Sequence, residues 1–214
     1  MFHLLIISLQ SETNKYEKMS KKGSITTSDY LPYPEYKRLV EALSHEGQYW
    51  WACYCIVSFC TGLRFSDVSK LRWGDLVEQK RIIVTEKKTG KTKSIPIGTN
   101  ASEHITQLYK ALGTPLKSDY FMLTEKSSGR PVTIQYINRT LKKMKDKYEL
   151  DIENFSTHTF RKTFGRYVYE KSGRTNESLL YLNRIFRHTN IDTTMIYLGI
   201  RDEEISNIFE SIEI

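Results

Sequence analysis

The sequence lacks the features that mark several large classes of protein. Its 214 residues include only three cysteines, and no Cys/His set has the spacing of zinc ligands. Cys53, Cys55 and Cys60 share one apolar run, and their odd number predicts buried free thiols in a reducing cytosol. No nucleotide-binding loop, internal repeat or low-complexity linker is present. We therefore expect a cytoplasmic protein that needs neither a metal nor another cofactor.

The apolar start of the chain is too short to cross a bilayer. Residues 1–9 lack a basic flank and a cleavage site, so we expect neither a transmembrane helix nor a signal peptide. The polar stretch behind them predicts a flexible lead over residues 1–29, with Met19 as a second candidate start of translation. The composition, 39% hydrophobic and 27% charged, is typical of a globular domain, which residues 30–214 are long enough to form. The formal charge of +7 favours a polyanionic partner without identifying one.

Apolar periodicity predicts an α+β domain that is mainly helical and has one small antiparallel sheet. The run at 48–60 is apolar on nearly every side, which predicts a buried central helix. Ser66 is a candidate N-cap for a short helix that ends at Lys70. Residues 81–85 and 92–97 predict two strands joined by a turn, and residues 73–77 are a candidate third strand. The remaining helices are expected at 33–47, 101–112, 133–148, 158–172, 177–186, 191–198 and 202–212.

Two arginines stand where they could hold a phosphate. Arg64 follows a glycine-containing turn and begins a helix, so it is either a surface charge paired with Asp67 or a clamp that donates two parallel hydrogen bonds. His158 and Arg161 are neighbours one turn apart on one helix face, as a solvated pair or as part of a site. Gly165, on the same face, would allow another backbone to approach closely.

Two further candidates are ambiguous when each is taken alone. His188 is either a satisfied core histidine or a site residue, and Tyr197 is one of 14 tyrosines. A short turn separates His188 from the helix that carries Thr193 and Tyr197 on one face. The histidine and the tyrosine could therefore share a pocket.

Basic side chains gather at one turn and on one helix. The turn that carries Lys87, Lys88 and Lys91 is either solvated or reaches into a nucleic-acid groove, where a lysine could protonate a leaving oxygen. We choose Lys88 for that role because it directly precedes Thr-Gly. The helix at 133–148 is either a solvated face or a contact for a nucleic-acid backbone. Its candidate contacts are Asn138, Arg139, Lys142, Lys143, Lys145 and Lys147.

The order of these residues is more specific than any one of them. Along the chain stand Thr61-Gly-Leu-Arg64 with Asp67 and Leu71, then Lys88-Thr-Gly, then His158-Thr-Phe-Arg161, then His188 and Thr193-Thr-x-x-Tyr197. This set resembles the tyrosine recombinase, or phage integrase, family. The resemblance covers residues 30–214, which would be the family's catalytic domain.

The resemblance implies a site-specific DNA recombinase that cuts and rejoins DNA strands without a metal. Tyr197 would be the nucleophile and would form a 3′-phosphotyrosyl link, while His158 would accept its proton. Lys88 would protonate the departing 5′-oxygen. Rejoining would need no ATP, because the covalent link keeps the energy of the phosphodiester.

The resemblance also assigns residues to the phosphate and partners to the protein. Arg64, Arg161 and His188 would bind the non-bridging oxygens, and Asp67 would orient Arg64 or stabilise the fold. The implied partners are double-stranded DNA, further copies of the chain in a tetramer, and an accessory DNA-bending protein.

Two departures from the family pattern matter. Phe186-Arg187 stands where the family usually has Leu-Gly, so we expect a different local backbone and a phosphate contact from Arg187. The helical DNA-clamping domain that most members carry before the catalytic one is not seen, so one copy would contact fewer phosphates, and assembly on DNA would compensate.

The acidic segment at 201–214 bears on that assembly. It carries an apolar stripe formed by Ile205, Ile208, Phe209 and Ile212. It packs either on its own domain or, as a docking helix, on a neighbouring copy.

Two other functions stay open. The chain could be an inactive DNA-binding accessory protein of a mobile element, although the complete catalytic set favours an active enzyme. It could also be a type IB topoisomerase, which would relax any supercoiled plasmid without a required site. The sequence does not give the DNA target or distinguish integration, excision and inversion.

Overall fold

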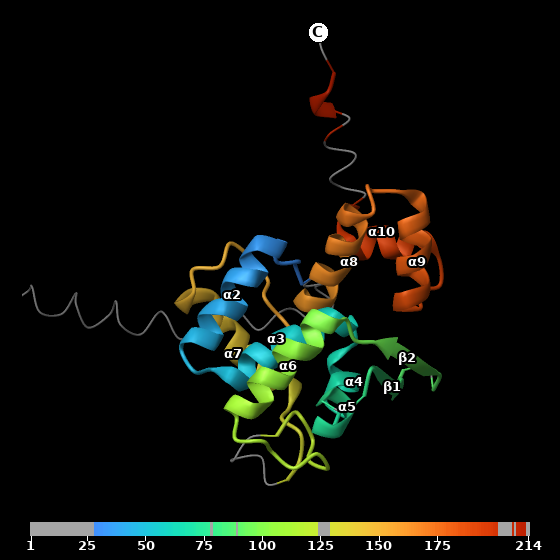
Figure 1. Cartoon of the computed structure of the whole chain (residues 1–214). Helices are drawn as coiled ribbons and strands as arrows, with labels where there is room; N and C mark the ends of the chain where they lie inside the picture. The colour runs from blue at the N-terminus through green and yellow to red at the C-terminus, as the bar shows by residue number, and fades with distance from the viewer. Residues whose placement is uncertain are drawn as a thin grey trace, which may run out of the picture.

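The computed structural model describes residues 28–77, 79–88, 90–123, 129–200, 207 and 209–212, and it confirms the mainly helical α+β class (Figure 1). The expected helix at 33–47 is α2 (Tyr33–His45), and the apolar run forms α3 (Tyr49–Thr61). The further elements are α4 (Phe65–Val68), α5 (Trp73–Val77), β1 (Arg81–Thr85), β2 (Thr92–Pro96), α6 (Thr99–Ala111), α7 (Ile134–Lys147), α8 (Thr159–Lys171), α9 (Asn176–Phe186) and α10 (Ile191–Leu198). Among the described residues, no helix is both long and apolar enough for a bilayer.

The central helix α3 organises the larger of two apolar cores. Its side chains are buried on almost every face, as its uniformly apolar sequence predicts, and α2, α6 and α8 pack around it. Cys53 and Cys55 are buried there and Cys60 is partly buried, all three as free thiols. Burial raises the pKa of each thiol, so these cysteines are inert packing residues.

Helix α8 joins this core to a second one that α9 and α10 build on it, which Figure 1 shows as the orange-red group of helices. The buried members of the second core are Tyr169, Leu179, Leu182, Phe186, Leu198 and Ile200. Gly165 lies where the three helices meet, and a Cβ there would stand 2.5 Å from Leu198 Cδ2 and 3.0 Å from the Phe186 ring. The mid-helix glycine therefore permits a close approach, as expected, but the neighbours are side chains and not another backbone.

The two strands form an antiparallel hairpin that packs beside α5. Their register runs from Arg81 opposite Pro96 to Thr85 opposite Thr92. Alternation buries Ile82 and Val84 on one face of β1. The turn that contains Lys88 connects the end of β1 to the start of β2.

Two local predictions were wrong. Residues 73–77 form the helix α5 and not a third strand. The Asp75 side chain accepts a hydrogen bond from the Arg72 N–H at 2.8 Å, which closes a helical turn, and only an isolated bridge joins Arg72 to Tyr120. Ser66 is not an N-cap, because α4 already begins at Phe65 with Arg64 in the capping position and ends at Val68.

The two ends of the expected domain lie mostly outside the described residues. The lead at 1–29 is described only from Ser28. Ser28 and Asp29 both bond to Asn154, which precedes α8, and Ser28 also bonds to Thr159, the first residue of α8. Of the helix expected at 202–212, the structure describes helical backbone at residues 207, 209 and 210.

Candidate active site

Arg64 is presented by the sharp turn between α3 and α4. Gly62 ends α3 with φ 55°, and a Cβ there would lie 2.9 Å from the Phe164 ring, so both its backbone conformation and its surroundings require glycine. Arg64 follows in extended conformation at the start of α4. Its side chain is half-buried and points toward the end of α9, where Nη2 lies 3.5 Å from the Phe186 carbonyl oxygen.

Arg161 is the central cation of the site. Its guanidinium is buried, donates to the Gly62 carbonyl oxygen through Nη1 and to the Phe186 carbonyl oxygen through Nη2 at 3.0 Å. It also lies 4.3 Å from the centre of the Phe186 ring. Burial lowers the Arg161 pKa to about 10, and it remains charged at neutral pH. One side chain thus joins the turn that carries Arg64 to the end of α9.

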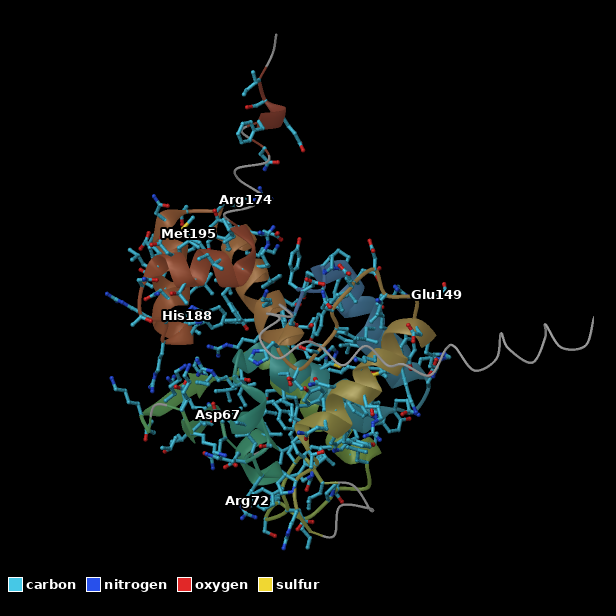
Figure 2. All side chains as sticks on the ribbon, turned by 180° about the vertical axis from the view of Figure 1, so that it is seen from behind. Asp67, Arg72, Glu149, Arg174, His188 and Met195 are labelled. Carbon is cyan, nitrogen blue, oxygen red and sulfur yellow. The ribbon has the colours of Figure 1, made fainter. Side chains whose placement is uncertain are left out.

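His188 follows α9 after one residue in the left-handed conformation, and Figure 2 shows it on the side of the α8–α10 group that faces the hairpin and Asp67. Its Nδ1 lies 3.0 Å from the Thr194 hydroxyl, which accepts a hydrogen bond from Asn183 at 3.2 Å. The Thr194 proton is then available to His188 Nδ1, which favours the tautomer with its proton on Nε2. Burial and then Arg161 lower the His188 pKa to about 4, so the ring is neutral at pH 7.

Tyr197 lies on α10, which Asn190 caps by accepting a hydrogen bond from the Thr193 N–H at 2.8 Å. The tyrosine ring packs edge-on against His188 and Phe186, with centroids 5.3 and 5.5 Å apart. Burial raises the Tyr197 pKa to about 12, although the nearby charges of Arg161 and Arg64 act to lower it. Arg161 lies close enough to lower that pKa, but among the described residues the buried hydroxyl has no well-formed hydrogen bond.

His158 precedes α8 and shares a cavity of about 370 Å³ with Tyr197. The other lining residues are Ser28, Ser156, Lys162, Thr193 and Ile196. The His158 side chain keeps contact with solvent, yet surrounding protein and then Arg161, Arg64 and Lys162 lower its pKa, so the ring is neutral at pH 7. Lys162 was missed in the sequence, and its Nζ stands 5.3 Å from the centre of the Tyr197 ring.

Lys88 is exposed at the hairpin turn, and its charge contributes to the lowered pKa of His188. Asp67 is buried and accepts a hydrogen bond from the Lys87 N–H at 2.9 Å. The aspartate side chain therefore holds the residue next to Lys88, and among the described residues its carboxylate makes no hydrogen bond with the Arg64 guanidinium. Of the two roles considered for Asp67, the geometry favours the structural one.

Glu86 was also missed, although it is as deeply buried as Asp67. It lies within 4 Å of Arg64, Lys93 and Arg187. The signal was present in the strand pattern, because Ile82, Val84 and Glu86 are spaced two residues apart and share the buried face.

The residues predicted to contact DNA are of two kinds. Lys87, Lys91, Arg139, Lys142 and Lys143 are exposed. Arg187 instead has protein partners in the hairpin. Asn138, on the same helix as Arg139, accepts a hydrogen bond from the Thr157 N–H at 3.0 Å and so supports the segment before His158. That any of the residues predicted to contact DNA does so stays a prediction.

The assembled site is suited to an anionic reactant. Arg64, Arg161, His158, His188 and Tyr197 come together from four separate segments of the chain. Arg64 Nη1 and the Tyr197 hydroxyl are both buried without a hydrogen-bond partner in the described part of the chain. A tetrahedral oxyanion placed between them would supply both partners. Within the described ranges, no three His, Cys, Asp or Glu side chains are grouped as metal ligands.

The chain is similar to known recombinases in sequence and in fold. "Probable integrase/recombinase YoeC" of Bacillus subtilis (strain 168) is 27% identical over 143 residues, which cover 67% of this chain and 74% of that protein. "Tyrosine recombinase XerC" of Xanthomonas axonopodis pv. citri (strain 306) is 21% identical over 155 residues, 72% of this chain and 48% of that protein. The structure of the XerH site-specific recombinase bound to palindromic difH substrate, in a post-cleavage complex, matches with a TM-score of 0.63 at 19% identity, over 86% of this chain and 54% of that chain.

The comparisons with solved structures and the match to a protein family support different conclusions. The structural likeness shows the fold, and this chain spans about half the length of the XerC and XerH proteins. Residues 29–204 match the phage integrase family, a range that includes every member of the site from Arg64 to Tyr197. The protein therefore belongs to the phage integrase family.

Proposed function

We propose that this chain is the catalytic domain of a site-specific DNA recombinase that cleaves and rejoins strands through Tyr197. The observation that carries the proposal is the buried Tyr197 hydroxyl, which lies beside Arg161 and Arg64 and makes no well-formed hydrogen bond among the described residues. A hydroxyl left in that state among fixed cations is suited to attack an anion.

The proposed reaction balances with the residues present. The Tyr197 oxygen attacks the phosphorus, and its proton passes to neutral His158. The bond from phosphorus to the 5′-oxygen breaks, and the leaving oxygen takes a proton from Lys88. A 3′-phosphotyrosyl link and a free 5′-hydroxyl result. Rejoining is the reverse attack by that hydroxyl, so no nucleotide is consumed.

Charge stabilisation falls to three other side chains. Attack on the phosphodiester places extra negative charge on its non-bridging oxygens, where Arg64 and Arg161 donate from a preorganised, partly water-excluded site. His188 donates from Nε2, in the tautomer that Thr194 favours. Arg161 does not reorganise during the reaction, because two carbonyl oxygens fix its guanidinium.

The test uses nicked duplexes drawn from the DNA that flanks the gene, incubated with the full chain in the presence of EDTA. We expect a covalent protein–DNA complex, and peptide mapping should locate the adduct at Tyr197. An adduct on another residue would overturn the proposal, and no adduct with any flanking DNA would favour an inactive binding protein. Relaxation of a supercoiled plasmid without any flanking sequence would favour a topoisomerase.

The assignment of Arg161 predicts that Arg161→Lys lowers the rate of strand cleavage about 10²–10³-fold, although the positive charge is kept. The lysine ammonium carries its donors on one nitrogen, so it cannot span the Gly62 and Phe186 carbonyl oxygens and a phosphate as the planar guanidinium does. The measurement is single-turnover formation of the covalent complex. Arg166→Lys is the matched control, because Arg166 is another buried arginine of α8 whose ion pair with Glu170 lies outside the site. Equal losses in both variants would show a general effect of altering α8.

Assembly of several copies on double-stranded DNA is part of the proposal. Phe209 and Ile212 are 70% and 61% exposed, so among the described residues of the tail the apolar stripe is not covered by this chain. The segment at 201–214 would then dock on a neighbouring copy. Its deletion should abolish cooperative binding to DNA in gel-shift titrations and leave the melting temperature unchanged; a tail-less protein that still assembles would exclude docking.

A further inference from the structure

Glu86 lies at the centre of a cluster of basic side chains from three elements. Its Oε1 is 2.6 Å from Lys93 Nζ on β2, and its Oε2 is 3.4 Å from Arg187 Nη1, just past α9. Arg64 Nη1, at the start of α4, is 3.8 Å from the same Oε2. The carboxylate is fully buried, so these contacts are shielded from solvent.

The cluster joins both sides of the hairpin to the end of α9. On the β2 side, Arg187 donates to the carbonyl oxygens of Lys91 at 3.2 Å and Thr92 at 3.1 Å. Lys93 Nζ donates to the carbonyl oxygen of Ile185, within the last turn of α9. Glu86, which directly follows β1, binds Arg187 and so joins the β1 side of the hairpin to the same place. The hairpin is thereby joined to the helix that leads directly to His188.

Lys88 lies in the short segment that these contacts enclose. Glu86, two residues before it, is held by the basic cluster, and the backbone N–H of Lys87 is held by Asp67. The turn itself is closed by hydrogen bonds between Glu86 and Lys91 and between Gly90 and Glu86. The exposed Lys88 side chain therefore extends from a backbone that is fixed on both sides.

The backbone of Arg187 is in a conformation that glycine adopts more readily. Its φ is 53°, in the left-handed region, where a residue with a Cβ is strained. The exposed Arg174 shares this conformation, so the strain alone assigns no role to the guanidinium. The contacts assign one: the fork-shaped group binds one carboxylate and two carbonyl oxygens at once.

We propose that Glu86 and Arg187 are positioning residues that hold the hairpin so that Lys88 can deliver its proton to the departing 5′-oxygen. Neither touches the reacting atoms. The inference rests on the proposed function, since it assigns to this pair a contribution to the same cleavage step.

The test separates proton delivery from every other contribution. Wild-type protein first maps the cleavage position, and two nicked duplexes are then compared, one natural and one with sulfur in place of the bridging 5′-oxygen. A thiol has a pKa of about 8.5, far below that of an alcohol, so the sulfur leaves without being protonated. Single-turnover rates are measured for the full chain in its Lys88→Ala, Arg187→Gly and Glu86→Gln forms.

We expect Arg187→Gly and Glu86→Gln to cleave the natural duplex about 10- to 100-fold more slowly than wild type, a part of the 10²–10⁴-fold that proton transfer contributes. On the sulfur duplex both should approach the wild-type rate, as Lys88→Ala should. Glycine suits the backbone at position 187, so Arg187→Gly should fold, and Glu86→Gln tests the same bridge from the other side.

Arg174→Gly is the matched control, because Arg174 is exposed and shares the left-handed conformation, with φ 59°. It should cleave both duplexes at the wild-type rate. A deficit of Arg187→Gly and Glu86→Gln that persists on the sulfur duplex would overturn the inference, as would natural cleavage at the wild-type rate or a Lys88→Ala form that sulfur does not rescue. If wild type forms no adduct with either duplex, the proposed function itself fails.

Discussion

Replacing Tyr197 with phenylalanine is expected to abolish covalent attachment to DNA while leaving the fold at least as stable. The substitution removes one oxygen, which is the proposed nucleophile. The ring that remains still packs against Phe186 and His188. The hydroxyl makes no well-formed hydrogen bond among the described residues, so its loss leaves no well-bonded donor or acceptor without its partner.

Two measurements check this result together. Gel analysis of the covalent complex should give a band for wild type and none for Tyr197→Phe, and thermal melting should give equal or higher Tm for the variant. Tyr181→Phe is the control, since this exposed tyrosine of α9 bonds only to Glu177 in the structure at 2.7 Å and should keep the wild-type yield. A covalent band in Tyr197→Phe would assign the nucleophile elsewhere. A fall in Tm of several degrees would mean that the hydroxyl has a structural role.

The helices that carry the site were predictable because their sequence signals are local. α10 was expected at 191–198 and is found there, with Asn190 as its cap and Gly199 in the left-handed conformation after it. The apolar run at 48–60 likewise indicated a helix buried on all sides, and α3 is that helix. In both cases a residue's neighbours within one turn decide the outcome.

Errors arose where distant partners or side-chain caps decide the local structure. Residues 73–77 include Trp73 and Val77, which favour strands, but also Gly74 and Asp75, which do not. A strand also needs a partner, and in the described part of the chain this segment has the single bridge from Arg72 to Tyr120. Without a ladder, the short-range bond from Asp75 to the Arg72 N–H determines the conformation. The intrinsic propensity of residues 73–77 reflects neither the missing partner strand nor this side-chain hydrogen bond.

The candidate site was predictable as a set of residue types and not as a set of contacts. The order Arg64, Lys88, His158, Arg161, His188 and Tyr197 was recognised through the resemblance to a family. The role of Phe186 was not, because its carbonyl oxygen accepts from Arg161 and faces Arg64, and a backbone atom leaves no trace in residue identity. Glu86 was overlooked because its cations stand 22, 7 and 101 positions away, although the period of two along β1 does place it on the buried face.

The second large effect concerns the proton of Tyr197. With a pKa of about 12, only about one part in 10⁵ of the hydroxyl is ionised at pH 7, so the attack depends on a base. His158 can serve, because protein burial and the cations Arg161, Arg64 and Lys162 lower its pKa and leave it neutral at pH 7. Wild-type cleavage should therefore be flat through neutral pH and fall only as acid protonates His158 below its ordinary value of about 6.5.

Substituting His158 by alanine should change both the rate and its dependence on pH. At pH 7 we expect cleavage to slow about 10²–10⁴-fold, the usual contribution of a positioned base. Between pH 7 and 9 the variant should gain about tenfold per unit, because its rate follows the phenolate fraction of Tyr197. Single-turnover cleavage at several pH values measures both, with the exposed His104→Ala as control, which should retain the wild-type profile.

The shape of the His158→Ala profile distinguishes the roles that this histidine could have. A deficit of the same size at every pH would mean that His158 binds the phosphate and does not take the proton. A variant that still shows a plateau would have another base, and Lys162 is the nearest alternative, since burial lowers its pKa and its Nζ lies over the Tyr197 ring. The double variant with Lys162→Met would then lose the plateau. Only a deficit that shrinks as the pH rises assigns the proton to His158, because hydroxide replaces a missing base and cannot replace a missing hydrogen-bond donor.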